Sequence, residues 1–314
     1  MKLSVIIPNY NGKPYLGDCL DAATDSLGGA PFEWEIIVVD DASPDGSAEI
    51  ATGFPGVKLI RQDMNVGFGA TCNNGVNVAR GDIVYLLNND VIVEKDFWEH
   101  LLRHFDSAGV FAVTSLSRDE NGHIVEARKL PGFVSGFLKP VVDVNPPLDS
   151  PSDTIYGSGG STAFRRDAFL SLGGFDPLYH PFYWEDFDLG YRAWKRGMRV
   201  IFEPRSKVLH RSHGVIRSSN REEYIGRINR RNQLICNWKN LTDAKLRAAH
   251  FAMLAVKTTA NVMTLRTYML PVIKEVAAKK DGIRAAREKE ASHIRISDED
   301  VFRLFDSSGK TAKV

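Results

Sequence analysis

The sequence predicts an α/β fold in which a mostly parallel sheet is flanked by helices and followed by a helical C-terminal extension. Two observations support this prediction. Short apolar runs alternate with helical patterns through the first ninety or so residues, as they do in βαβ crossovers. From about residue 222 onward the periodicity is helical. We therefore expect one domain over residues 1–215 and a helical extension over residues 216–314.

Composition narrows the class of protein. The chain has 314 residues, of which 43% are hydrophobic and 25% charged, as is typical of soluble globular proteins. A formal net charge of +1 gives no overall attraction to nucleic acid. The 3 cysteines are scattered, which disfavours a disulfide framework or a zinc site. No apolar run reaches the ~18 residues of a transmembrane helix, and no signal peptide is recognisable, so we expect a cytoplasmic protein.

Four short apolar runs predict the first strands, because each is typical of a buried strand bounded by turn residues. These strands cover residues 3–7, 34–39, 57–61 and 83–87. The segments between them carry helical spacing or helix start signals. They predict helices at residues 15–23, after the turn at 42–47, and at 70–79.

Three of these strands end in polar clusters: Asn9-Tyr10-Asn11, Asp40-Asp41 and Asn88-Asn89-Asp90. Turn statistics alone would explain any one of them. Because parallel strands share one carboxyl edge, however, all three converge on a single crevice, where open α/β sheets bind ligands. Carboxylate and amide oxygens suit a hard divalent cation that carries phosphate. Asp90 is therefore a candidate ligand of Mg²⁺ or Mn²⁺.

The middle of the chain has a weaker pattern. Residues 111–115 predict a strand, whereas residues 118–156 are rich in Pro, Gly and Asp, and we expect irregular loops that face an acceptor. Gly159 and Gly160 belong to a Gly-rich turn that lets backbone approach a ligand closely. The remaining elements of this part are two helices and two short strands. We expect the helices at about 164–172 and 185–195, and the strands at 200–202 and 207–209.

The last hundred residues predict helices at 222–238 and 243–280, the second interrupted at Pro271, and a frayed tail at 306–314. Apolar stripes run along these helices among Lys and Arg. Such stripes normally pack on the body of the same protein, and the alternative is contact with an anionic membrane surface.

Further candidate residues follow from their chemistry. Glu185 and Asp186 are adjacent carboxylates beside Trp184, and like charges in apolar surroundings raise at least one pKa, as a general base requires. The alternative is an ordinary acidic helix start. His210 lies in a polar segment and could ligate the same metal as Asp90, although a lone histidine is more often structural. Tyr10 could stack on a base, or simply cover the core.

Five motifs then carry a resemblance to a known family. They are Ser-Val-Ile-Ile-Pro-Asn-Tyr-Asn (4–11), Val-Val-Asp-Asp-Ala-Ser-Pro-Asp-Gly-Ser (38–47), Asn-Val-Gly-Phe-Gly (65–69), Asn-Asn-Asp (88–90) and Trp-Glu-Asp (184–186). Their order, over about residues 3–214, resembles the family-2 glycosyltransferases of GT-A fold, and is similar to bacterial rhamnosyltransferase-like enzymes. The resemblance implies inverting transfer of a sugar from a nucleotide-sugar donor.

The resemblance also implies roles for individual residues. Asp41 and Tyr10 would hold the base, Asp90 would be the metal-binding end of the DxD motif with His210 as a further ligand, and Asp186 would deprotonate the acceptor hydroxyl. The cofactor would be Mn²⁺ or Mg²⁺. The other implied positions divide between the nucleotide site, with Pro8, Gly67 and Asn89, and the donor and acceptor pocket, with Asn88, Gly159, Gly160, Trp184 and Glu185.

Two departures refine this expectation. Asn88 stands where the DxD motif has its first Asp, and an amide coordinates a metal less strongly than a carboxylate does. No QxxRW motif follows Asp186, so we expect the transfer of a single sugar rather than polymerisation.

The expected partners are a UDP- or dTDP-sugar donor and a glycan or lipid-linked acceptor in bacterial surface glycan or cell-wall polysaccharide synthesis. Peripheral contact with the inner face of the membrane and a homodimer are left open. Two other functions compete. A nucleotide-sugar pyrophosphorylase would need a Gly-rich basic loop near the N-terminus, and residues 8–13 supply a poor version. A non-catalytic assembly partner is suggested by Asn88 and the helical tail.

Overall fold

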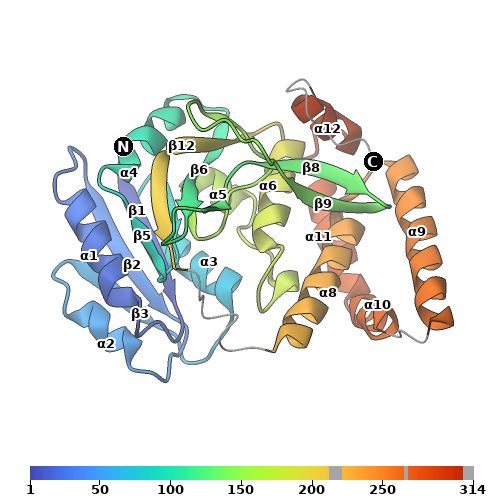
Figure 1. Ribbon diagram of the computed structural model, residues 1–314, viewed down its shortest axis with the longest axis horizontal. Coiled ribbons are helices and arrows are strands. Elements are labelled where there is room, and N and C mark those ends of the chain that lie inside the picture. Colours follow the sequence, from blue (N-terminus) through green and yellow to red (C-terminus); the bar gives the residue numbers. More distant parts are fainter. Residues whose placement is uncertain (212–220, 265–267, 307–314) are drawn as a thin grey trace.

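A computed structural model describes residues 1–211, 221–264 and 268–306. Its centre is a 10-stranded sheet whose main path runs β10-β12-β6-β11-β4-β1-β2-β3, with β5 paired to β12 and β7 paired to β6 (Figure 1). The strands are β1 (Leu3–Asn9), β2 (Trp34–Asp40), β3 (Val57–Arg61), β4 (Ile83–Leu87), β5 (Val91–Val93), β6 (Val110–Arg118), β7 (Ile124–Glu126), β10 (Ser152–Asp153), β11 (Ser161–Arg165) and β12 (Arg199–His210).

The sheet is mostly parallel, as predicted. Along the main path, only β10 and β11 run against the direction that the other strands share. Helices α1 (Leu16–Leu27), α2 (Ser47–Thr52) and α3 (Phe68–Val78) connect the first four strands. Side chains of a strand alternate between its two faces, so β1 feeds two cores. Ile6 belongs to the core with Val76 of α3, and Val5 and Ile7 belong to the core with Leu16 of α1.

The expectation of irregular loops over residues 118–156 is wrong. This segment contains β7, β10 and the hairpin of β8 (Lys129–Val134) and β9 (Phe137–Val142). Asn237, in a helix far along the chain, exchanges two hydrogen bonds with the backbone of Leu138. Strand formation here depends on distant packing, which local periodicity does not reveal. The two short strands expected at 200–209 are likewise one strand, β12, with an irregular register between Glu203 and Lys207.

Helices cover the rest of the molecule. The middle of the chain forms α4 (Phe97–Leu102), η1 (Arg103–Asp106), α5 (Arg166–Ser171), η2 (Pro177–Tyr179) and α6 (Glu185–Lys195). The C-terminal part forms α8 (Glu222–Asn240), α9 (Ala244–Met263), α10 (Met269–Ala278), α11 (Lys280–Ala291) and α12 (Asp298–Asp306). The helix predicted at 222–238 is confirmed. The helical stretch predicted at 243–280 with an interruption at Pro271 is divided into α9 and α10, but the division comes earlier, and Pro271 lies in the first turn of α10. Residues 307–314 of the predicted tail lie outside the described residues.

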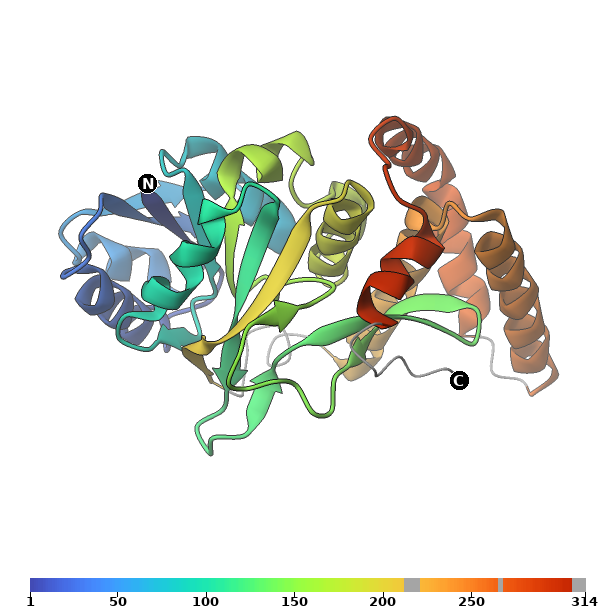
Figure 2. The same cartoon turned by 90° about the horizontal axis from the view of Figure 1, so that it is seen from above.

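The C-terminal helices lie at the end of the molecule away from β1–β3, beside the β8–β9 hairpin (Figures 1 and 2). Val272 of α10 and Phe305 of α12 share one hydrophobic core with Phe187 and Trp194 of α6. Apolar stripes of the extension therefore pack on the body, although Phe251 and Val262 of α9 stay exposed. No helix in the described parts of the chain is both long and apolar enough to cross a bilayer. The domain division at residue 215 stays a prediction.

Candidate active site

Asn9, the last residue of β1, connects all three polar strand ends. Its amide Nδ2 donates to Asp40 Oδ1 at 2.7 Å, and its Oδ1 accepts from Asn89 Nδ2 at 2.8 Å. All three side chains are buried. The expected convergence of β1, β2 and β4 on one edge therefore exists. Pro8 is buried one position earlier in the same strand, while Tyr10, one position later, is 36% exposed and free to meet a ligand.

Asp41 organises the loop that precedes α3. Its Oδ1 accepts hydrogen bonds from Val66 N (2.7 Å) and Gln62 Nε2 (2.8 Å), and its Oδ2 accepts from Gly67 N (2.9 Å). Burial nevertheless raises the pKa of this carboxyl above its usual range. Gly67 has φ = 84°, and a Cβ there would lie 2.8 Å from His180 Nδ1, so only glycine fits. Asp41 thereby holds the loop before α3 against the end of β2.

Asn88 marks the end of β4, where β11 begins beside it. Its backbone N–H donates to the carbonyl of Gly160 at 3.0 Å, and a Cβ at Gly160 would lie 2.7 Å from Asn88 Nδ2. A Cβ at Gly159 would lie 2.9 Å from Phe68. The two glycines thus let the 157–160 turn pack closely against Asn88 and Phe68. The Oδ1 of Asn88 is buried and has no hydrogen-bond partner among the described residues.

Asp90 and His210 come together because β5 pairs with the last residues of β12. His210 lies opposite Val91 in that pairing, and its Nε2 is 3.5 Å from Asp90 Oδ2. The interaction with Asp90 raises the pKa of His210, although burial of the ring opposes this shift. Asp90 Oδ1 is buried without a hydrogen-bond partner among the described residues.

The residues around Asp90 fit a divalent cation. Asp90 Oδ1 and Asn88 Oδ1 are buried acceptors with no described donor, and the imidazole of His210 faces the same carboxylate. Across the described ranges, no group of three or more His, Cys, Asp or Glu side chains has the spacing of a metal site. The protein would thus supply few ligands, as is usual for Mg²⁺ and similar ions that also bind substrate phosphates.

Asp186 lies in the first turn of α6, after a constrained loop. Tyr183 and Trp184 both have positive φ, 71° and 80°, which is costly for residues with large side chains. Asn232 of α8 holds this loop: its Nδ2 donates to the carbonyls of Phe182 and Tyr183, each at 2.9 Å. The indole Nε1 of Trp184 also donates to Asn229 Oδ1, at 2.7 Å. Helix α8 therefore fixes the entry into α6.

The adjacent carboxyls Glu185 and Asp186 are both perturbed, as predicted for a general base. Burial raises the pKa of Asp186 to about 6, and the negative charge of Glu126 adds to this shift. Burial and the charge of Asp186 raise the pKa of Glu185 well above its usual range. Within the described residues, the Asp186 side chain has one hydrogen bond: its Oδ1 accepts from the backbone N–H of Phe187, at 2.7 Å. Asp186 therefore resembles a base whose second oxygen remains available.

Glu126 of β7 interacts electrostatically with both Asp186 and His210. Its charge raises the pKa of Asp186 and also, as a smaller contribution, that of His210. Its own carboxylate accepts from Lys129 Nζ at 2.6 Å. Because Coulomb interactions weaken with distance, both groups lie within electrostatic reach of Glu126. That Asp186 and Asp90 line one pocket stays a prediction.

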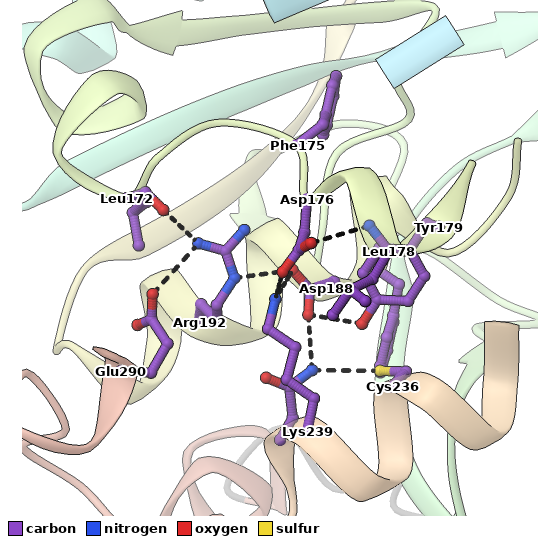
Figure 3. A network of polar contacts seen from close by, with 12 residues as sticks. Leu172, Phe175, Asp176, Leu178, Tyr179, Asp188, Arg192, Cys236, Lys239 and Glu290 are labelled. Carbon is purple, nitrogen blue, oxygen red and sulfur yellow. Dashed lines mark hydrogen bonds and ion pairs between the residues drawn. The ribbon is translucent and has the colours of Figure 1, made fainter. Parts of the chain in front are cut away.

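A buried network anchors the other side of α6 (Figure 3). Asp188 accepts from Tyr179 Oη, Asn240 Nδ2 and Arg192 Nε, each at 2.7 Å, and from Lys239 Nζ at 2.9 Å. The Arg192 and Lys239 cations hold the pKa of Asp188 far below its usual range despite its complete burial. This carboxylate fixes α6 against α8.

Sequence reasoning missed several residues that organise this site. Asn9 belonged to a recognised polar cluster, yet its place at the centre of the hydrogen bonds did not follow from local sequence. Glu126 was overlooked because its short strand lies in the segment expected to be irregular. Asn232 and Asp188 depend on partners about fifty residues away along the chain. Asn89 and Trp184, expected in the binding pockets, make hydrogen bonds that tie β4 to β1 and α6 to α8.

Comparison with solved structures defines the class of fold, which is of the GT-A type. The chain superposes on a crystal structure of GalNAc-T7 with UDP, GalNAc and Mn²⁺, with a TM-score of 0.63 and 18% identity, covering 90% of this chain and 57% of that one. It superposes on S. aureus TarS 1–349 in complex with UDP-GlcNAc with a TM-score of 0.57 and 18% identity, covering 98% and 92%. At this level of identity the likeness concerns the fold.

Sequence comparison then gives the family. The model of glycosyl transferase family 2 matches residues 4–173, and the chain belongs to that family. An N-acetylglucosaminyl-diphospho-decaprenol L-rhamnosyltransferase of Mycobacterium tuberculosis is 29% identical over 204 residues, 56% of this chain and 66% of that protein. The O-antigen chain rhamnosyltransferase RfbN of Salmonella typhimurium is 25% identical over 216 residues, 67% of this chain and 66% of that protein. The chain thus spans just under two thirds of the length of these two relatives.

Proposed function

We propose that this glycosyltransferase moves one sugar, with inversion, from a UDP- or dTDP-sugar to a hydroxyl of a glycan or lipid-linked acceptor. The observation that supports this most is that the charge of Glu126 raises the pKa of Asp186, a buried carboxyl, and also that of His210, whose Nε2 lies 3.5 Å from Asp90 Oδ2. Inversion needs a base on one side of the sugar and stabilised negative charge on the other. The names of the two rhamnosyltransferases support a role in bacterial surface glycan synthesis.

In the proposed mechanism, Asp186 accepts the proton of the acceptor hydroxyl while that oxygen attacks the anomeric carbon. The bond from this carbon to the donor diphosphate breaks on the opposite face of the sugar. Because its pKa is raised to about 6, Asp186 is ionised at neutral pH and still basic enough to take the proton. A well-placed base of this kind contributes about 10²–10⁴-fold in rate.

Asp90 and His210, with the amide of Asn88, would hold Mn²⁺ or Mg²⁺ at the carboxyl end of β4. When bound, the cation would neutralise charge that develops on the leaving diphosphate. Tyr10 would stack on the base. Asp41 would accept the base N–H with the one remaining lone pair of its Oδ2, since each carboxylate oxygen has two and Oδ1 already accepts two hydrogen bonds. A lipid-linked acceptor would bring the enzyme to the inner face of the membrane as a peripheral protein.

The substitution Asp186→Asn tests the assignment of the base. It keeps the shape of the side chain and its hydrogen bond from Phe187, so binding of UDP should be unchanged while transfer falls about 10²–10⁴-fold. Normal turnover by this variant would contradict the assignment. Hydrolysis of a nucleotide-sugar by the native chain with Mn²⁺ would exclude a non-catalytic role. Release of pyrophosphate from a nucleoside triphosphate would favour a pyrophosphorylase instead.

The metal site has its own test. A ligand that binds the folded state raises the unfolding temperature, so UDP should stabilise the native chain more with Mn²⁺ than without it. We expect Asp90→Ala and His210→Ala to remove the difference that Mn²⁺ makes. Asp21→Ala, an exposed acidic position on α1, serves as the control and should keep it. An unchanged Mn²⁺ effect in both site variants would show that the cation binds elsewhere.

A further inference from the structure

A cavity lies between the first turns of α8 and the start of α10, and none of the candidate sugar-transfer residues lines it. Its volume is about 300 Å³. These two helices lie side by side in Figure 1, and they contact one another. We call this cavity the arginine pocket. Its main lining residues are Arg221, Glu223, Tyr224, Arg227, Arg230 and Tyr268.

The arginine pocket has an excess of positive charge. Three arginines line it, against one glutamate. Arg227 is paired with Glu275 of α10, whereas Arg221 and Arg230 have no carboxylate within ion-pair distance among the described residues. The Nε of Arg230 is buried without a hydrogen-bond partner in the same described parts. An unpaired guanidinium with buried N–H groups is stabilised by an anion.

Aromatic rings hold these guanidinium groups in place. The Arg230 guanidinium lies over the ring of Tyr268, 5.0 Å from its centroid, and that of Arg227 lies over Tyr224, at 5.5 Å. Stacking on a ring face leaves the N–H edge of a guanidinium available for bidentate contact with phosphate oxygens. The pocket is thus preorganised for a phosphate-sized anion rather than for a flexible surface ion pair.

The arginine pocket adjoins the loop that leads to Asp186. The ring of Tyr224 lies 6.3 Å from that of Phe182, and Asn229, next to Arg230, accepts the hydrogen bond from the indole of Trp184. Apolar side chains are exposed beside it, where α9 ends and α10 begins: Met263 is 80% exposed and Leu270 is 46% exposed. An anion-binding pocket beside exposed apolar side chains matches an amphiphile with a phosphate group.

We propose that the arginine pocket binds the phosphate or diphosphate of a lipid-linked acceptor and so presents its sugar to Asp186. This inference rests on the proposed function, because it identifies the chemical class of the acceptor. Arg230 and Arg227 supply the hydrogen bonds, and the apolar ends of α9 and α10 face the lipid chain. A phospholipid headgroup offers the same phosphate chemistry, and the experiment separates the two sources.

The test is an isothermal calorimetric titration of the full chain with geranyl diphosphate. Saturating UDP and Mn²⁺ are present, so that the donor diphosphate site is already filled. We expect the dissociation constant to rise at least about ten-fold in Arg230→Gln and further in Arg227→Gln/Arg230→Gln, because charge-assisted hydrogen bonds are lost. Arg230→Lys should recover part of the affinity. Arg284→Gln, an exposed arginine on α11, is the matched control and should bind as the native chain does.

Geraniol, which has the same hydrocarbon chain without phosphate, should not bind. Equal affinity of the native chain and the double variant for geranyl diphosphate would overturn the proposal, as would equal affinity for geraniol. Binding to phosphatidylglycerol vesicles that is lost in the double variant, with geranyl diphosphate affinity unchanged, would assign the pocket to the membrane surface and also overturn it. Failure of UDP to bind in a separate titration would instead contradict the proposed donor site.

Discussion

Asp186 and Asp188 are two residues apart on α6, and they are opposite in character. Residues two apart on a helix are separated by about 200°, so the two side chains leave opposite sides of α6. Asp188 meets Arg192 and Lys239, and its pKa falls far below the usual range. Asp186 meets Glu126 and no described cation within ion-pair distance, and its pKa rises to about 6. Burial alone therefore does not decide the role of a carboxylate; the charges that face it do.

The largest change, a loss of folding stability, should come from removing Asp188, the carboxylate that is paired with cations. Asp188→Ala would remove the buried carboxylate that Arg192 and Lys239 share, and removal of one partner from a buried ion pair typically costs about 3–5 kcal/mol. Each cation would keep one other carboxylate: Asp176 lies 2.7 Å from Lys239, and Glu290 lies 3.7 Å from Arg192. Urea denaturation measures the free energy of unfolding. The exposed pair Asp281–Arg284 is the control, and Asp281→Ala should change stability by less than about 1 kcal/mol. Similar losses for both variants would show that burial does not distinguish them.

Asp186→Asn should do the reverse and stabilise the protein. The folded-state pKa of about 6 lies above that of an unfolded Asp, so ionisation of Asp186 opposes folding. The opposition is complete well above pH 6, fades as the pH falls from 6 towards 4, and is absent well below pH 4, where both states hold the proton. The gain in unfolding free energy should thus reach up to about 3 kcal/mol at pH 8. If Asp186→Asn is less stable than the native chain at pH 8, burial of the ionised Asp186 carboxylate does not oppose folding, and the interpretation is wrong.

The smallest expected effect is on the pH dependence of kcat/KM. It comes from Glu126, the negative charge that acts on Asp186. Native kcat/KM should rise with pH through about 6, as Asp186 loses its proton. Glu126→Gln removes a like charge, so this rise should move to lower pH, by the equivalent of less than about 1 kcal/mol because the pair is partly exposed to water. Glu120→Gln changes an exposed acid on the turn before β7 and is the control. A shift to higher pH would contradict the assigned electrostatics.

The strands and polar ends of the first ninety residues could be predicted because their signals are local. Apolar runs such as residues 34–39 identify buried strands, and parallel pairing places Asn9, Asp40 and Asp90 at one edge. The remaining parts depend on contacts distant in sequence. The β8–β9 hairpin is stabilised by Asn237, and α11 is rich in charged residues and buries only Ile283 and Glu290. Neither Glu126 nor Asn232 shows its function until the chain is folded.

The ion pairs of α6 have a consequence for truncated forms of the protein. Asp188 depends on Lys239, Lys195 pairs with Asp298 at 2.6 Å, and Arg196 pairs with Glu290 at 2.8 Å. Each of these partners lies beyond residue 215. A fragment cut at that point would retain the sheet and every candidate sugar-transfer residue. It would, however, leave several buried charges on α6, the helix that carries Asp186, without these partners. Shortened versions intended for crystallisation or assay should therefore extend through α12.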